Sequence, residues 1–131
     1  MTAEGEQRPD GRPSGGGSRI LLVEDIFLVA ETYRALLEKL GYSVAGPAGS
    51  VADALQVLED ESVDGGLLDI SLGGTLSTPV AARLQEMDRP FVFLTAMADL
   101  AILPEEYRGA VIIQKPVVEA DLHRALKEAG L

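Results

Sequence analysis

Several side chains that could handle a phosphoryl group stand at the ends of apolar runs. Glu24 and Asp25 follow "RILLV", and Asp69 follows "GGLL". Thr95 ends "PFVFLT", and Lys115 follows "AVIIQ". Carboxylates at close range repel and raise one another's pKa values, a conflict that a divalent cation removes. Mg²⁺ prefers oxygen ligands, and an aspartate can itself be the nucleophile that forms an acyl phosphate.

Each of these residues also has an ordinary structural interpretation. Asp25 could cap a helix, and Asp69 could be a turn residue. Thr95 is a common strand residue and Lys115 a common surface residue. Their chemistry becomes the better explanation only if the fold brings them together, so the elements around them must be placed first.

The elements follow from the spacing of apolar residues along residues 19–131. Short apolar runs predict buried strands at residues 19–23, 42–46, 65–69, 90–95 and 110–114. Between and after them, apolar residues recur every three or four positions, which is typical of amphipathic helices. The first such helix begins with Ile26 and the last with Val118, while Ser50 can cap the second. A loop with two glycines is expected after the third strand, and residues 98–108 predict a short or mobile fourth helix.

Strands that alternate with helices predict an α/β fold, in which helices cover both faces of a five-stranded parallel sheet. Right-handed crossovers make this a doubly wound layer. In such sheets functional groups gather at the carboxyl ends of the strands. The side chains named first all stand at those ends, so we expect one site with Mg²⁺ and Lys115 on either side of a phosphoryl group.

Composition narrows the class of protein. The chain has 131 residues and a net charge of −10, and it has no cysteine. Acidic domains repel phosphate backbones, so we expect no nucleic-acid partner. No apolar run approaches the roughly 20 residues that span a bilayer, and no secretory signal is present, so we expect a cytoplasmic protein without membrane insertion. Residues 1–18 are rich in Gly and Pro and predict a flexible tail before a domain at residues 19–131.

Four motifs in order carry a family resemblance: "LLVEDI", "LLDISL", "FLTA" and "QKP". Together they resemble the receiver domain of two-component response regulators, over residues 19 to about 129. The resemblance implies a CheY-like strand order of 2-1-3-4-5. It also implies that Asp69 is the phosphoacceptor and that Glu24, Asp25, Asp69 and the backbone carbonyl of Ser71 hold Mg²⁺.

The same resemblance assigns the remaining site residues and the partners. Thr95 would be the switch hydroxyl, Lys115 would pair with the phosphoryl group, and the Lys115–Pro116 bond resembles one that is cis in the family. The donor would be a sensor histidine kinase or a histidine phosphotransfer protein. Because no output domain follows the last helix, we expect a stand-alone regulator or phosphate sink, not an enzyme, that signals by contact with a downstream protein.

The chain departs from the usual receiver pattern three positions before the lysine, where Ile112 replaces an aromatic switch residue. It is similar in this respect to a receiver subgroup with Pro-Phe-x-Phe-Ala-Thr-Gly on the fourth strand. The matches are Pro90, Phe91, Phe93 and Thr95, and the departures are Leu94, Ala96 and Met97. Ser71 stands where that subgroup carries Asn.

Two alternatives remain open at this point. The chain could be a receiver-like docking module that needs no phosphorylation, which Ile112 favours and the intact Asp69 and Lys115 oppose. It could also be a phosphohydrolase of the haloacid-dehalogenase type. That class normally carries a second aspartate where this chain has Ser71, and it needs a substrate cap for which no sequence remains.

Overall fold

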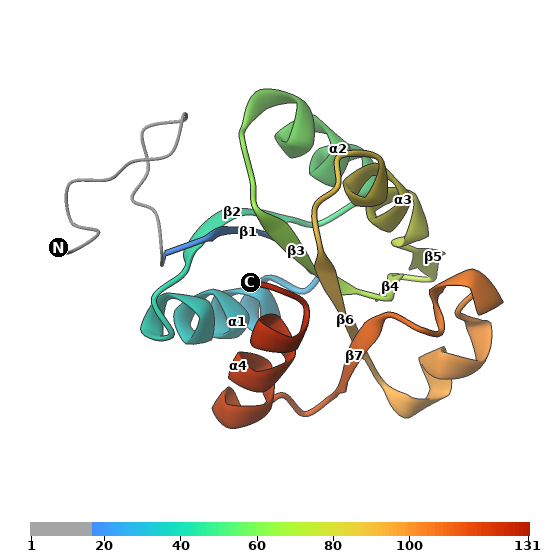
Figure 1. Cartoon of the computed structure of the whole chain (residues 1–131). Coiled ribbons are helices and arrows are strands. Elements are labelled where there is room, and N and C mark those ends of the chain that lie inside the picture. The colour runs from blue at the N-terminus through green and yellow to red at the C-terminus, as the bar shows by residue number, and fades with distance from the viewer. Residues whose placement is uncertain (1–16) are drawn as a thin grey trace, which may run out of the picture.

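The computed structural model describes residues 17–131 (Figure 1). Most of the tail predicted at residues 1–18 therefore lies outside the described residues. The elements, in chain order, are β1 (Arg19–Val23), α1 (Phe27–Lys39), β2 (Ser43–Ala48), α2 (Val51–Asp60), β3 (Gly65–Asp69), β4 (Ser71–Leu72), β5 (Thr75–Leu76), α3 (Thr78–Glu86), β6 (Phe91–Thr95), the 3₁₀ helices η1 (Met97–Ile102) and η2 (Glu105–Tyr107), β7 (Val111–Gln114) and α4 (Glu119–Glu128). Within the described part, every helix is too short or too polar to cross a membrane.

The main sheet is parallel and has the order β2-β1-β3-β6-β7. When only its five strands are counted, this is the predicted order 2-1-3-4-5. Central strands pair in simple register, with Leu22 opposite Leu67 and Leu67 opposite Val92. Because all strands run the same way, their carboxyl ends lie at one edge of the sheet.

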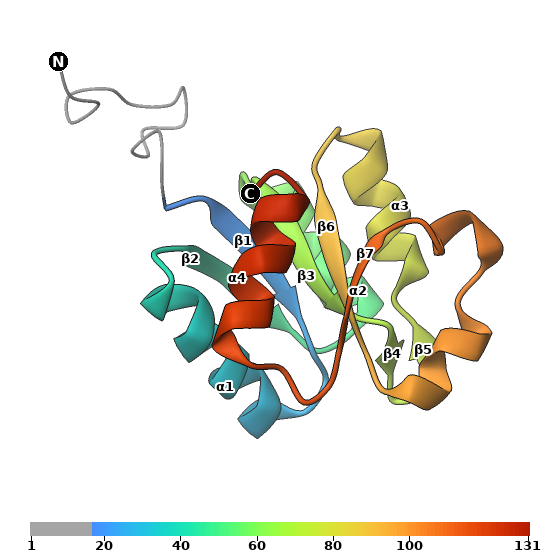
Figure 2. The same cartoon turned by 60° about the horizontal axis from the view of Figure 1, so that its bottom comes forward.

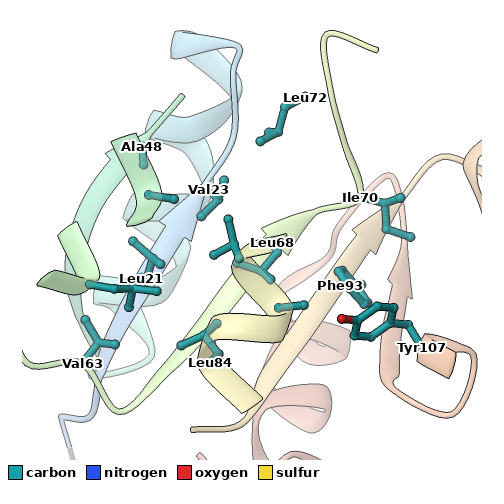
Figure 3. Packing of buried hydrophobic residues seen from close by; sticks show 14 of the residues in the cluster. Leu21, Val23, Ala48, Val63, Leu68, Ile70, Leu72, Leu84, Phe93 and Tyr107 are labelled. Atoms are coloured by element: carbon teal, nitrogen blue, oxygen red, sulfur yellow. The ribbon is translucent and has the colours of Figure 1, made fainter. Parts of the chain in front are cut away.

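Helices cover both faces of the sheet, as predicted (Figures 1 and 2). The cluster under α1 and α4 contains Ile20 and Leu22, and the cluster under α2 and α3 contains Leu21 and Val23. This alternation is what a strand buried on both faces requires. All four side chains are completely buried, so β1 is fixed from both sides; Figure 3 shows Leu21 and Val23 in the cluster under α2 and α3.

The segment before β7 forms the two short helices η1 and η2, which confirms that the fourth helix is short. Pro104 separates them, and a proline has no N–H with which to continue a helix. Tyr107 at the end of η2 packs edge-on against Phe93, with ring centroids 5.9 Å apart (Figure 3). Phe93 also packs against Phe91 at 5.2 Å, so three aromatic rings anchor this segment to β6.

The loop expected after β3 is instead a small antiparallel hairpin made of β4 and β5. Gly73 and Gly74 form its turn with φ angles of 60° and 93°. Positive φ at both central residues is the signature of the type I′ turn, whose twist matches that of paired strands. The hairpin therefore depends on two glycines that the sequence places side by side.

Two helices begin later than the apolar spacing suggested. Ile26 and Val118 were expected on buried helix faces, but they are the N-caps of α1 and α4 and are 55% and 51% exposed. Both have extended backbones, so their side chains do not follow the helical row. Ser50 caps α2 as predicted, since its hydroxyl accepts a hydrogen bond from the Asp53 N–H at 3.1 Å.

Candidate functional site

Three carboxylates meet at the carboxyl edge of the sheet. Glu24 and Asp25 directly follow β1, and Asp69 is the last residue of the neighbouring strand β3. One carboxylate oxygen from each lies within 4.8 Å of the others. Glu24 and Asp69 are buried, whereas Asp25 is exposed. The cluster predicted from the strand ends is thus present, with two carboxylates fixed inside the protein and one at its surface.

Lys115 places its ammonium group between the two buried carboxylates. Its Nζ donates to Asp69 Oδ2 at 2.6 Å and lies 3.5 Å from Glu24 Oε1. The Lys115 backbone N–H also donates to the Thr95 carbonyl at 2.8 Å, which ties the end of β7 to that of β6. The Lys115–Pro116 peptide is cis. Burial alone would lower the pKa of Lys115, but Asp69 and Glu24 outweigh burial and raise it, so the lysine stays charged.

Glu24 is in the least favourable electrostatic position of the three acids. Its side chain has no exposed surface, and desolvation, helped by the neighbouring Asp69, raises its pKa to about 7. Its Oε2 accepts a hydrogen bond from the Ile26 N–H at 3.1 Å. Among residues 17–131, its Oε1 has no hydrogen-bond donor. A buried carboxylate oxygen without a donor costs free energy, which a bound cation would recover.

The donor set fits a hard divalent cation. It consists of carboxylate oxygens on adjacent strands, one of them solvent-accessible, and Mg²⁺ takes oxygen ligands while it keeps several waters. Glu24 Oε1, which accepts no hydrogen bond among residues 17–131 and has the Lys115 ammonium at 3.5 Å, is the atom that a cation would satisfy. Glu24, Asp25 and Asp69 could therefore hold Mg²⁺.

The β4–β5 hairpin determines which way the Ser71 carbonyl points. Ser77 N–H donates to the Ile70 carbonyl at 2.9 Å, so Ile70 and Ser77 are a hydrogen-bonded pair. Bonded and non-bonded pairs alternate along antiparallel strands. The next pair, Ser71 with Leu76, is therefore non-bonded, and its backbone groups point away from the partner strand. This leaves the Ser71 carbonyl available as a further oxygen ligand.

Thr95 reaches the same edge, but its hydroxyl is not part of the charged cluster. The side chain is buried, and its Oγ1 donates to the Ala96 carbonyl at 2.5 Å. No described residue of the acidic cluster bonds to it. The exposed Ala96 follows directly and opens η1. The structure thus brings Glu24, Asp25, Asp69 and Lys115 together and leaves the Thr95 hydroxyl bound to its own chain.

Sequence reasoning missed two contributions to this site. The first is the Ile26 N–H that holds Glu24, a backbone group that no residue type can signal. The second is the hairpin, whose two adjacent glycines were a usable sign of a type I′ turn. Strands of two residues are too short to show a period, so that sign was the only one.

Comparisons with known proteins agree with this geometry. The family model described as the response regulator receiver domain matches residues 20–127. The positive alginate biosynthesis regulatory protein of Pseudomonas aeruginosa is 35% identical over 115 residues, which cover 85% of this chain and 46% of that protein. The phyllosphere-induced regulator PhyR of Methylorubrum extorquens is 30% identical over 86% of this chain and 43% of its own.

The solved structures that resemble this chain extend the comparison to shape. The solution structure of SdrG from Sphingomonas melonis Fr1 is 36% identical, with a TM-score of 0.78, and the match covers 87% of this chain and 97% of that one. A receiver domain (CheY-like) from Methylobacillus flagellatus is 26% identical, with a TM-score of 0.73 over 86% of this chain and 98% of that one. The chain spans less than half the length of the curated relatives named above.

Proposed function

The chain belongs to the response regulator receiver domain family, and from that premise we propose that it accepts a phosphoryl group on Asp69 in a Mg²⁺-dependent reaction. The donor is a phosphohistidine on a sensor histidine kinase or a histidine phosphotransfer protein. Receiver domains are signalling modules of two-component systems, so the product is a signal and not a released metabolite. The haloacid-dehalogenase interpretation is left without support.

One observation carries this proposal: the Lys115 ammonium lies between two buried carboxylates, 2.6 Å from the Asp69 oxygen. A docking module without phosphorylation has no use for this arrangement, since burying charges costs more than an apolar contact of the same size. An acceptor site does need it, because phosphoryl transfer depends mainly on positioning and charge neutralisation.

The reaction is a displacement at phosphorus. An Asp69 carboxylate oxygen attacks the phosphorus atom and forms the P–O bond of an acyl phosphate. The P–N bond to the donor imidazole breaks, and its electron pair stays on the ring nitrogen. Asp69 ends its strand, where its backbone is paired to Leu94 on β6, and its carboxylate lies beside the Lys115 ammonium at the carboxyl edge of the sheet.

The surrounding residues stabilise the charge that arrives. Mg²⁺, when bound, would supply positive charge against the phosphoryl oxygens. Lys115, now bound to Asp69 Oδ2, would pair with the phosphoryl group. Glu24, Asp25, Asp69 and the Ser71 carbonyl would hold the cation. Once phosphorylated, the Asp69 side chain carries about −1.5 to −2 charges on its phosphoryl oxygens, where the ionised carboxylate carried −1, so negative charge both increases and moves outward from the strand end.

The response would run through Thr95. Its hydroxyl now donates to the Ala96 carbonyl, and it must leave that acceptor to reach a phosphoryl oxygen. This exchange would change the backbone at the start of η1. A modification shifts an equilibrium only through contacts that differ between two states, and the Thr95 hydrogen bond is such a contact. The changed surface would then bind a downstream protein.

The donor would dock on an apolar patch beside the acid cluster. Ile26, Phe27 and Leu28 follow Asp25 immediately and are 55%, 71% and 75% exposed. Consecutive exposed apolar residues of this size are unusual unless a partner covers them. Their position next to the carboxylates suits a donor that must bring its histidine to Asp69.

The proposal is tested by treating the protein with acetyl phosphate and Mg²⁺ and measuring its intact mass. We expect one added phosphoryl group on the wild-type protein, none on Asp69→Asn, and none on the wild type in EDTA. Asp69→Asn keeps the shape of the side chain and removes its charge, so it is a matched control. An adduct that persists in Asp69→Asn would contradict the assignment of the acceptor.

A further inference from the structure

Three of the four charged side chains in the site extend from one face of the sheet. They are Glu24, Asp69 and Lys115. Each stands two positions after an apolar residue of the cluster under α1 and α4, namely Leu22, Leu67 and Ile113. Strand pairing continues to these ends, since the Glu24 N–H donates to the Ala48 carbonyl at 3.0 Å and the Lys115 N–H donates to the end of β6. Side chains two positions apart on a strand point the same way, so these charges lie on the side of the sheet that α1 covers.

Tyr33 is the polar-tipped side chain that α1 directs toward this face. It is 6% exposed and belongs to the same cluster, with Ala30 and Leu37 as the other buried residues of the helix. Side chains of a helix lean toward its N-terminus. Because α1 begins at Phe27, two residues after Asp25, the Tyr33 phenol runs back along the helix toward the acid cluster.

The electrostatics of the Tyr33 hydroxyl agree with that direction. Burial raises its pKa, the positive charge of Lys115 lowers it, and the negative charges of Glu24 and Asp69 raise it. Neighbouring charges shift a pKa from close range, so the hydroxyl lies near all three groups and keeps its proton. Within residues 17–131 this hydroxyl makes no hydrogen bond. It is a donor without an acceptor, close to Glu24 Oε1, which is an acceptor without a donor.

We propose that Tyr33 is a positioning residue for Glu24, and that its hydroxyl donates to Glu24 Oε1 when Lys115 turns to the phosphoryl group. At present the Lys115 ammonium is the positive charge beside that oxygen, at 3.5 Å. A carboxylate oxygen has two lone pairs, so Oε1 can accept this hydrogen bond and still face a cation. The hydroxyl would thus keep Glu24 oriented while the lysine leaves it. This inference rests on the proposed function, because phosphorylation is what gives Lys115 a new partner.

Tyr42 offers a matched control, because it shares the residue type, the cluster and the burial of Tyr33. It is 7% exposed in the cluster under α1 and α4. It directly precedes β2 and so lies at the amino edge of the sheet, opposite the acids. Burial alone raises its pKa, and its buried hydroxyl has no partner in the described part of the chain. Tyr33→Phe and Tyr42→Phe therefore remove the same atom from the same cluster, near the charges and far from them.

The test is a double-mutant cycle in metal-free buffer, in which Lys115→Met imitates the departure of the ammonium. Each Tyr→Phe change is made in the wild type and in Lys115→Met, and urea unfolding is measured at about pH 9, where Glu24, with a pKa of about 7, is ionised. Tyr33→Phe should raise the unfolding equilibrium constant by less than about twofold in the wild type and by about tenfold in Lys115→Met, as for a hydrogen bond to a charged group. Tyr42→Phe should act by the same factor in both backgrounds.

A second measurement follows the reaction itself by intact mass after treatment with acetyl phosphate and Mg²⁺. Labelling should be about fivefold slower in Tyr33→Phe and within about twofold of wild type in Tyr42→Phe, the range of one hydrogen bond. Should Lys115→Met fail to fold, equal labelling rates for the two tyrosine variants would overturn the role of Tyr33. In the cycle, a Tyr33→Phe effect that is the same in both backgrounds would overturn it as well. A wild-type protein that takes no phosphoryl group would overturn the proposed function, and with it the step in which Lys115 moves.

Discussion

The two sides of the sheet edge are built in different ways. On the acceptor side, defined here as Glu24, Asp25, Asp69 and Lys115, strand ends place charges in contact, and a 2.6 Å ion pair joins β3 to the residue after β7. On the response side, defined as Thr95 with η1 and η2, the only polar side chain at the strand end bonds to its own neighbour Ala96. Charged side chains from different strands therefore pair on the acceptor side, whereas the Thr95 side chain on the response side bonds only within its own segment.

The surroundings of the two sides differ as well. Beneath the acceptor side, β1 and β3 are buried on both faces. The response side continues into two short 3₁₀ helices, and a hollow of about 370 Å³ lies beside Ile112, lined also by Leu100, Ala101, Leu103 and Arg108. Segments with few buried contacts open at lower free energy than core strands do. The carboxylates are thus held by fully buried strands, whereas the segment after β6 borders an open hollow.

The largest change in stability is expected when the ion pair of the acceptor side is removed. Lys115→Met removes the cation between two buried carboxylates, and losing one member of a buried pair costs several kcal/mol. Since the Lys115 side chain is 28% exposed, we expect a smaller loss, about 2 kcal/mol of unfolding free energy in metal-free buffer. Urea denaturation at about pH 8 measures it, because Glu24, with a pKa of about 7, is then mostly ionised.

Lys39→Met is the matched control for that experiment. Lys39 also pairs with a carboxylate, Glu119, at 2.9 Å, but its side chain is 70% exposed. Surface ion pairs contribute about 0–1 kcal/mol, so the control should change stability little. Added Mg²⁺ should restore part of the loss in Lys115→Met. Equal losses for the two lysine variants would show that the acceptor side is not a buried electrostatic network.

The second prediction concerns the rate of phosphotransfer and tests which side of the sheet edge the phosphoryl donor contacts. Phe27, two residues after Asp25 of the acceptor side, and Ile102 on the response side are both apolar and exposed, at 71% and 52%. Phe27→Ser should slow phosphotransfer from a sensor kinase that labels the wild type by about tenfold, equivalent to about 1.4 kcal/mol, whereas Ile102→Ser should not. Labelling by acetyl phosphate, which needs no docking surface, should be unchanged in both. Equal slowing by both variants would contradict a donor surface confined to α1.

The acceptor side was also the more predictable from the sequence. A short apolar run followed by an acidic residue is recognisable in the sequence. Because parallel strands bring their carboxyl ends to one edge of the sheet, this pattern was enough to predict that Glu24, Asp25 and Asp69 lie together. The strand order followed from the resemblance. The apolar spacing failed at Ile26, because the Glu24 carboxylate holds its N–H and keeps the chain extended for one more residue.

The response side could not be predicted to the same depth. The weak helical signal at residues 98–108 did indicate a short helix, but 3₁₀ turns have no long period to detect. The direction of the Thr95 hydroxyl depends on a rotamer and on a neighbouring carbonyl, and neither is written in residue types. The sequence did show that Ile112 replaces an aromatic residue. The structure adds that Ile112 lines the hollow between β7 and η1.

The smallest change in stability is expected when a larger side chain at position 112 fills the hollow. A larger side chain in a packed core usually costs about 1–3 kcal/mol. Ile112 is only half-buried and lines the hollow, so Ile112→Tyr should change the unfolding free energy by less than about 1 kcal/mol. Ile113→Tyr is the matched control. Ile113 is 6% exposed in the cluster under α1 and α4, so this variant should lose about 1–3 kcal/mol of unfolding free energy.

If the open space is what leaves η1 loosely held, the ring in Ile112→Tyr should also slow amide hydrogen exchange in η1, since it adds apolar contacts under Leu100 and Leu103. Unchanged exchange in η1, with Ile112→Tyr as costly as Ile113→Tyr, would mean that the response side is as tightly packed as the acceptor side and that the contrast between them lies in charge alone.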